Sequence, residues 1–109
     1  MTVFEKIIAG ELPCDRVYED DQCLAFKDIN PIAPLHILVV PKKHIERLSH
    51  ASLEDQGLLG HLMRVAALVA KEQGYEDFRV ITNNGAGAGQ TVFHLHLHVI
   101  AGKAVGFPH

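Results

Sequence analysis

The stretch "TVFHLHLHVI", residues 91–100, predicts a strand with two chemically different faces. Alternate residues of a strand point the same way, and residues i and i+2 lie about 6.6 Å apart. His94, His96 and His98 therefore share one face. The opposite face is expected to point toward a core, and it carries Phe93, Leu95, Leu97 and Val99. This strand thus joins the core of the fold to three imidazoles.

Four further strands are predicted upstream of this one. They are expected at residues 15–19, 23–28, 36–41 and 78–82. Most neighbouring strands are joined by short connections, which favour antiparallel pairing. The expected fold class is therefore α+β, with a five-stranded antiparallel sheet and helices packed against it.

Two helices complete the predicted fold. Residues 2–10 favour a short helix, in which Thr2 and Glu5 form a capping box. A long helix is expected from about Ser52 to Gln73, and it ends before Gly74. Its apolar residues cover more than one helical stripe, namely Leu58, Leu59, Leu62, Met63, Val65, Ala66 and Val69. The excess predicts an exposed apolar patch and a two-fold homodimer.

Size and composition limit the class of protein. At 109 residues and 48% hydrophobic content, the chain is expected to form one domain, residues 1–109. The net charge of −3 argues against a nucleic-acid binder, which needs a basic surface. No apolar run reaches the length of a membrane span, and the N-terminus does not resemble a signal peptide. Cys14 and Cys23 match no zinc or redox spacing, so we expect reduced thiols in a cytoplasmic protein.

Three explanations compete for the three histidines. They can belong to a solvent-exposed sheet face, although histidine is not favoured in strands. They can bind a metal, since a His-x-His strand with a further ligand is a workable zinc geometry. They can also act in nucleophilic catalysis at phosphorus, because a neutral imidazole can attack while its neighbours donate hydrogen bonds.

The glycine-rich loop before the strand favours the phosphorus chemistry. "GAGAGQT", residues 85–91, contains no lysine and precedes a strand, so it is neither a Walker loop nor a dinucleotide fingerprint. Its glycines nevertheless allow backbone N–H groups to approach an anion. Gln90 and Thr91 add side-chain donors directly before the histidines.

The motif "HLHLHVI" resembles the His-φ-His-φ-His-φ-φ signature of the histidine triad superfamily, where φ is apolar. "VFEKIIAGELP", "CLAFKDINPIAPLHILVVPKKHI", "LLGHL" and "NNGAGAGQTVFHLHLHVIAG" extend the resemblance to the Hint branch, the histidine triad nucleotide-binding proteins. It covers nearly the whole chain. The resemblance implies one histidine triad domain whose sheet is extended across a homodimer.

The resemblance also implies an activity. Proteins of the Hint branch hydrolyse purine nucleoside 5′-phosphoramidates, derivatives of AMP or GMP, through a covalent nucleotidyl-histidine. They need no metal and no other cofactor. Two alternatives stay open: a Fhit-like hydrolase of dinucleoside polyphosphates, and a nucleotide-binding regulatory module with residual activity.

Catalytic roles follow from the match to the triad. The resemblance makes His96 the nucleophile and His94 the residue that orients it through its main-chain carbonyl. His98 is expected to contact phosphate oxygens and to assist the leaving group. His36 resembles a fourth, supporting histidine; without the resemblance, a core histidine at the start of a strand would be the favoured explanation. Thr91 stands where the family often has serine.

Contacts to the nucleotide are assigned in the same way. Asp28 resembles the residue that binds the ribose hydroxyls, and a turn cap is its structural alternative. The expected phosphate side comprises Asn83, Gly89, Gln90 and Thr91, and the base site comprises Val3, Phe4, Ile7, Leu12, Phe26 and Ile29. Phe107 stands where Hint proteins usually have tryptophan, in a tail that reaches the partner's site. Surface or structural positions are expected for Lys42, Lys43, His44, His50 and His61.

Overall fold

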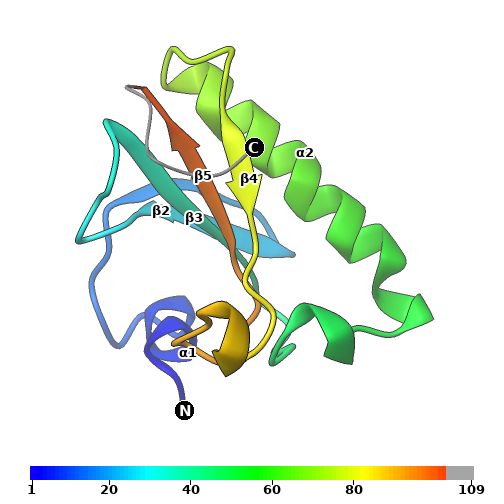
Figure 1. Ribbon diagram of the computed structural model, residues 1–109. Helices are drawn as coiled ribbons and strands as arrows, with labels where there is room; N and C mark the ends of the chain where they lie inside the picture. Colours follow the sequence, from blue (N-terminus) through cyan, green and yellow to red (C-terminus); the bar gives the residue numbers. More distant parts are fainter. Residues whose placement is uncertain (103–109) are drawn as a thin grey trace.

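The structure, a computed structural model, describes residues 1–102, so Phe107 lies outside the described residues. It is a five-stranded antiparallel sheet with the strand order β1-β2-β3-β5-β4, one long helix on one face and a short helix near one end of the strands (Figure 1). The helices are α1 (Val3–Ile8) and α2 (Gln56–Glu72), and the strands are β1 (Arg16–Glu19), β2 (Cys23–Lys27), β3 (Leu35–Pro41), β4 (Arg79–Ile81) and β5 (Leu97–Ala101). Three 3-10 turns connect them: η1 (Leu48–His50), η2 (Leu53–Asp55) and η3 (Ala86–Ala88). The predicted α+β fold is confirmed, and in the described part of the chain no helix is long and apolar enough to cross a membrane.

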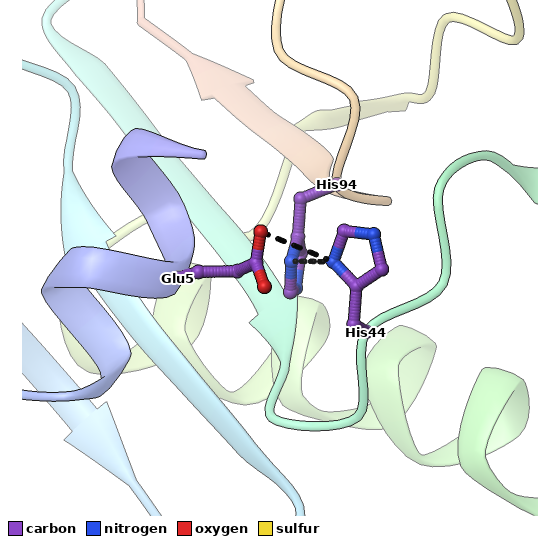
Figure 2. A group of neighbouring side chains, drawn as sticks. All are labelled: Glu5, His44 and His94. Carbon is purple, nitrogen blue, oxygen red and sulfur yellow. Dashed lines mark hydrogen bonds and ion pairs between the residues drawn. The ribbon is translucent and has the colours of Figure 1, made fainter. Parts of the chain in front are cut away.

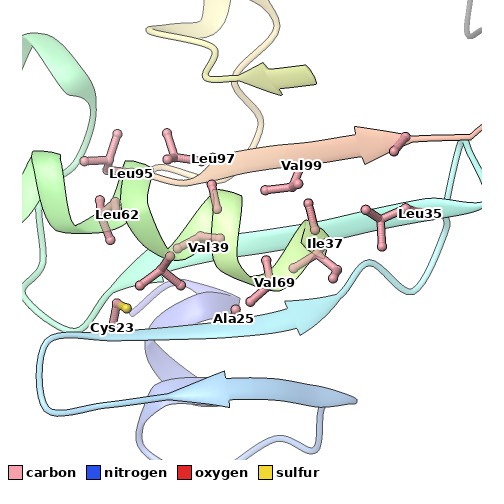
Figure 3. Close-up of a cluster of buried hydrophobic side chains, with 14 of the residues drawn as sticks. Cys23, Ala25, Leu35, Ile37, Val39, Leu62, Val69, Leu95, Leu97 and Val99 are labelled. Carbon is pink, nitrogen blue, oxygen red and sulfur yellow. The ribbon is translucent and has the colours of Figure 1, made fainter. Parts of the chain in front are cut away.

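Alternation along the central strands divides the interior into two clusters. On β2, Cys23 and Ala25 belong to the cluster under α2, whereas Leu24 and Phe26 belong to the cluster that contains Phe4 of α1. The α2 cluster also contains Leu35, Ile37, Val39, Leu62, Val65, Ala66, Val69, Leu95, Leu97 and Val99, many of which Figure 3 shows between helix and sheet. Both faces of β2 and β3 are therefore buried.

Helix α1 is specified by its own sequence. Thr2 Oγ1 accepts from Glu5 N at 3.1 Å, and Thr2 N donates to Glu5 Oε1 at 2.8 Å, which confirms the predicted capping box. Phe4 and Ile7 form its buried face. Because the helix is only six residues long, it depends on this packing and on the cap for its stability.

Helix α2 begins later than predicted. The Ser52–Asp55 capping box is present, but it encloses the 3-10 turn η2, and the α-helix starts at Gln56. The expected excess of apolar surface is also smaller. Of the seven residues, four are buried and Leu58 and Leu59 pack partly against the core, which leaves Met63 as the one that is more than half exposed.

The last strand differs most from expectation. Residues 91–96 lie outside the ladder, and β5 begins at Leu97. The β3–β5 register places Val39 opposite Leu97, so two residues further along β3 Pro41 would face Leu95. Proline has no N–H to continue that ladder. Leu95 N instead donates to Ile45 O at 2.7 Å.

A close approach fixes the other end of β5. Gly102 follows the strand with φ +106°, a conformation that residues with a side chain rarely adopt. A Cβ atom at this position would lie 2.6 Å from Pro34 Cγ. The chain before β3 and the chain after β5 can therefore touch only because residue 102 is glycine.

Candidate functional site

A cavity of about 1220 Å³ opens beside α1, on the face of the sheet opposite α2. Among the described residues its lining comprises Val3, Phe4, Ile7, Leu12, Pro13, Cys14, Asp15, Phe26, Lys27, Asp28, Ile29, Asn30, Leu38, Asn83, Gly89, Thr91, Val92, His96 and His98. One wall is apolar and comes from α1 and β2, and the other carries imidazole, amide and hydroxyl groups. Such a cavity suits a ligand with one flat apolar part and one anionic part.

Two of the three histidines, His96 and His98, line this cavity, and only His98 belongs to the regular strand. His96 is buried, and its Nδ1 lies 2.7 Å from the carbonyl oxygen of His94. A carbonyl can only accept, so Nδ1 of His96 carries the hydrogen and Nε2 keeps a free lone pair. The ring of Phe4 packs edge-on against His96 with centroids 4.9 Å apart, which holds the imidazole at the cavity wall.

His94 is also held by a hydrogen bond to a main-chain carbonyl, but it does not line the cavity. Its side chain is completely buried, and Nε2 lies 2.7 Å from the carbonyl oxygen of Pro41. Nε2 therefore donates, and Nδ1 of the neutral ring is an acceptor. The Pro41 carbonyl can serve in this way because the ladder does not continue past it.

A chain of hydrogen bonds fixes the third ring. Ile32 N donates to His36 Nδ1 at 3.2 Å, so the hydrogen of the neutral His36 ring is on Nε2. That nitrogen lies 2.9 Å from His98 Nδ1 and donates to it. His98 therefore presents an N–H at Nε2, while His96 presents a lone pair. Asp28 Oδ2, 3.4 Å from His36 Nε2, favours a hydrogen at that position.

Burial keeps these rings neutral. Burial lowers the pKa of His96. The hydrogen bond to His94 O and the charge of Asp28 have the opposite effect and raise it, but they do not outweigh burial. Burial also lowers the pKa of His94 and of His36. The pKa of His98 falls to about 4, first through burial and then because the nearby His96 and His36 rings disfavour a positive charge, with Asp28 opposing. A free nucleophilic nitrogen at neutral pH is the chemical result.

The predicted phosphate-side residues divide into two groups. Asn83, Gly89 and Thr91 line the cavity. Gln90 does not, and its expected role as a donor to the ligand is wrong. Its Oε1 accepts from Gly85 N, and its Nε2 donates to the carbonyls of Glu46 and Val92. Both amide hydrogens are thereby used to brace the glycine-rich loop.

Several backbone N–H groups of the glycine-rich loop form hydrogen bonds within the loop, which its composition did not suggest. The N–H groups of Ala88, Gly89 and Gln90 donate to carbonyls of the same loop. They are not free to surround an anion. Gly89, with φ +93°, ends the turn η3 at the cavity wall.

The residues predicted for the base site all line the cavity, but to different depths. Phe4, Ile7 and Phe26 are buried, whereas Val3 and Leu12 are exposed at the rim. Ile29 is 91% exposed and stands at the mouth. Asp28 also lies at the wall, and its Oδ1 accepts from Asn30 N at 2.8 Å. It is therefore a turn cap, and Oδ2 lies toward His36.

Some residues of the site were not identified from the sequence. Leu38, Cys14 and Val92 line the cavity, and Leu38 lies opposite His98 in the β3–β5 register. The alternation of β3 would have placed Leu38 on the face of His36. His44, expected to be surface or structural, contacts the triad: its Nδ1 lies 3.2 Å from His94 Nδ1 (Figure 2). The sequence carries no local signal for that contact.

Three groups of described residues place possible metal-ligand atoms within 4.8 Å of one another: Glu5, His44 and His94; Asp20, Cys23 and His61; and Asp28, His36 and His98. In the second group, burial raises the pKa of Cys23 to about 12, which disfavours the thiolate that a metal needs. In the third, the facing ring nitrogens bond each other. In the first, the facing Nδ1 atoms of His44 and His94 lie within hydrogen-bond distance of each other, at 3.2 Å.

Comparisons with known proteins agree with this geometry. The sequence model of the HIT domain matches residues 9–105. The chain is 56% identical over 108 residues to an uncharacterized HIT-like protein of Synechocystis, covering 98% of this chain and 95% of that protein. A solved histidine triad protein from Clostridium difficile is 47% identical, with TM-score 0.93 and coverage of 98% and 95% of the two chains. A HIT family hydrolase from Legionella pneumophila is 38% identical, with TM-score 0.94 and coverage of 99% and 98%.

Proposed function

The chain belongs to the HIT domain family, and from this premise we propose that it is a hydrolase of purine nucleoside 5′-phosphoramidates of the Hint type. The observation that carries the proposal is the tautomer of His96. Its Nδ1–H is bound to the carbonyl of His94, so Nε2 is a neutral nucleophile in a cavity large enough for a nucleotide.

The first half of the reaction forms a bond between His96 Nε2 and the α-phosphorus. The P–N bond to the amine breaks, and its electron pair stays on the amine nitrogen. His98 supplies the proton that this nitrogen needs. The bound phosphate anion offsets the influences that keep the pKa of His98 low, so the ring takes up a proton on Nδ1 together with the substrate. The hydrogen bond from His36 Nε2 to that nitrogen then breaks, and the Nε2–H of His36 turns to Asp28 Oδ2, 3.4 Å away.

The second half restores the enzyme. Water attacks the phosphorus of the nucleotidyl-histidine and passes a proton to Nε2 of His98, which lost its hydrogen to the leaving amine in the first half. The P–Nε2 bond breaks, its electrons return to His96, and the nucleoside monophosphate leaves. Splitting the reaction replaces one difficult step by two easier ones. Thr91, at the cavity wall, can donate its hydroxyl hydrogen to the phosphate or to the leaving amine.

Charge and polarity orient the nucleotide. The apolar wall formed by Phe4, Ile7 and Phe26 accepts the base by burial and ring contact. Asp28 keeps acceptor capacity beside the Asn30 bond and binds the vicinal ribose hydroxyls. Asn83 and Thr91 then face the phosphate.

The proposal includes a homodimer. Met63 and Leu68 are 52% and 42% exposed on the outer side of α2, and β4 is an edge strand of the sheet. Pairing across that edge would extend the sheet and cover both side chains. The tail with Phe107, which lies outside the described residues, would then reach the partner's site and affect the choice of leaving group.

Mass spectrometry after mixing with an adenosine phosphoramidate tests the nucleophile directly. The intact protein should gain one adenylyl group, and digestion should place it on His96. The His96→Asn variant, which has no lone pair of comparable basicity, is the control and should stay unmodified. Wild-type protein that turns the substrate over without ever carrying the group would refute the covalent mechanism.

Turnover of two substrates separates the proposed enzyme from the alternatives. An adenosine phosphoramidate should be hydrolysed faster, in kcat/KM, than a diadenosine polyphosphate. The reverse order would favour a Fhit-like hydrolase. Tight binding of AMP without turnover of either compound would favour a nucleotide-binding module.

A further inference from the structure

Three side chains from distant parts of the sequence meet behind the cavity, and the proposed mechanism does not use two of them. Glu5 comes from α1, His44 from the loop after β3, and His94 from the segment before β5 (Figure 2). His44 Nδ1 lies 3.2 Å from His94 Nδ1 and 3.5 Å from Glu5 Oε1. Figure 2 shows the two contacts, from Glu5 and from His94, meeting at the same ring nitrogen of His44.

The positions of the hydrogens in this group follow from its neighbours. His94 Nε2 donates to Pro41 O, and burial lowers the pKa of His94, so its ring is neutral and Nδ1 only accepts. The short contact between the two Nδ1 atoms therefore requires His44 to donate. The carboxylate of Glu5 lies beside the same N–H, and it favours a hydrogen on that nitrogen of His44.

This hydrogen bond lies where the sheet gives no support. The ladder of β5 starts at Leu97, so His94 is not held by strand pairing. The ring of His94 is anchored at both nitrogens instead, by Pro41 O and by His44. The carbonyl of the same residue accepts the Nδ1–H of His96. A shift of His94 would therefore move the group that fixes the tautomer of His96.

We propose that His44 is a positioning residue for the nucleophile, acting through His94. It donates to His94 Nδ1, and so holds the main-chain carbonyl that keeps Nε2 of His96 free. Glu5 orients His44 from α1, the helix whose Phe4 packs on the His96 ring. The role in catalysis rests on the proposed function of His96, whereas the hydrogen bond itself does not.

Nuclear magnetic resonance of the 15N-labelled wild-type protein tests the hydrogen bond without any assay of activity. A scalar coupling across the N–H···N bond should join Nδ1 of His44 to Nδ1 of His94. The His94 ring should have its hydrogen on Nε2. Absence of the coupling, or a His94 ring with its hydrogen on Nδ1, would overturn the proposal. A change in these signals on dialysis of freshly purified protein against a chelator would also overturn it, because a metal would then occupy the cluster.

Three variants test the positioning role. His44→Leu removes the donor and should lower kcat about five- to tenfold, the effect of one lost hydrogen bond, with KM and AMP affinity within about twofold. His44→Asn keeps a donor close to the place of Nδ1 and should restore kcat to within about twofold of wild type. His50→Leu is the matched control, since the His50 side chain has the same 46% exposure as His44. Its contacts with Glu46 and Arg47 lie within its own segment, so the substitution should change neither constant.

The outcomes separate this inference from the proposed function. Equal loss in His44→Leu and His44→Asn, or none in either, would refute the positioning role. If His44→Leu does not fold, His44→Ala beside His44→Asn gives the same comparison. A wild-type protein without turnover would refute the proposed function, and the loss of the His96 Nδ1–H signal in His44→Leu would still measure the coupling.

Discussion

Acidification should tighten the binding of a nucleotide to this protein, because His98 takes up a proton when an anion arrives beside it. The pKa of His98 in the free protein is about 4, held low by burial and by the nearby His96 and His36 rings, which disfavour a positive charge. A phosphate group in the cavity adds a nearby negative charge and favours the protonated ring. By reciprocity, protons must then favour the phosphate to the same extent.

The size of the effect follows from this pKa. If the bound anion restores the pKa of His98 to its ordinary value of about 6.5, the ring is mostly neutral in both states at pH 7. At pH 5 it is still mostly neutral when free but almost fully charged when bound. The expected gain in affinity between pH 7 and pH 5 is therefore about twentyfold.

Calorimetry with the methyl ester of AMP measures this gain. The ester keeps one negative charge across this pH range, so the ligand does not titrate. His98→Gln keeps a donor close to the place of Nε2 but cannot titrate, and its affinity should change much less with pH. Affinity that is independent of pH in the wild type, or an equal pH dependence in His98→Gln, would refute the role assigned to His98.

The lowered pKa of His98 also makes the stability of the protein depend on pH, which limits the pH range of the binding experiment. A histidine with a lowered pKa in the folded state binds fewer protons there than in the unfolded chain. It contributes stability above its unfolded pKa of about 6.5, and this stability is lost as the pH falls toward about 4. The free energy of unfolding in urea should therefore decrease over that window, and binding is best measured at pH 5 or above, with circular dichroism to verify folding.

Four further predictions follow from the site and the surface. His96→Ala should lower kcat by about 10³ to 10⁶ and leave AMP binding within a few-fold, as measured by steady-state kinetics and calorimetry; more than a tenth of wild-type activity would contradict the nucleophile assignment. Chelation should leave activity unchanged, and a loss that zinc reverses would instead indicate a catalytic metal. Asp28→Asn keeps the acceptor for Asn30 N but loses the charge, so it should reduce the preference for ribose over deoxyribose nucleotides, a comparison of two kcat/KM values. Light scattering at micromolar protein should give about twice the 12.0 kDa chain mass, and a monomer would remove the proposed interface and the role of the tail.

Local sequence signals predicted the parts of this fold that depend on neighbouring residues. The capping box of Thr2 and Glu5 lies within one helical turn, and both of its hydrogen bonds form. The apolar pattern located β1 to β4 to within one residue at each end. Alternation along residues 94–98 correctly placed His96 and His98 at one surface, although only part of that segment is a strand.

The errors arose where a partner distant in the sequence decides the structure. The start of β5 depends on Pro41, which would have faced Leu95 and cannot donate a hydrogen bond. Phe93 was expected to face the core but is 36% exposed, because its segment leaves the sheet. His44 contacts His94 across 50 residues, and no periodicity reports such a contact. Gln90 has a side chain suited to phosphate, but it satisfies carbonyls that only the folded loop brings near.

The hydrogens on His94, His96 and His36 are assigned by main-chain atoms, the carbonyls of Pro41 and His94 and the amide of Ile32. No substitution removes a main-chain carbonyl, and only proline removes a main-chain N–H. Other substitutions can only displace these groups. Most side-chain substitutions therefore leave the tautomers of these histidines unchanged, whereas a change in the path of the backbone would alter them. At Gly102 a single added methyl group would push against Pro34 and so displace the backbone. Such positions therefore affect function although they line no part of the cavity. A library screened for altered reactivity would find informative variants there, at the geometric supports of the site, as well as among the histidines.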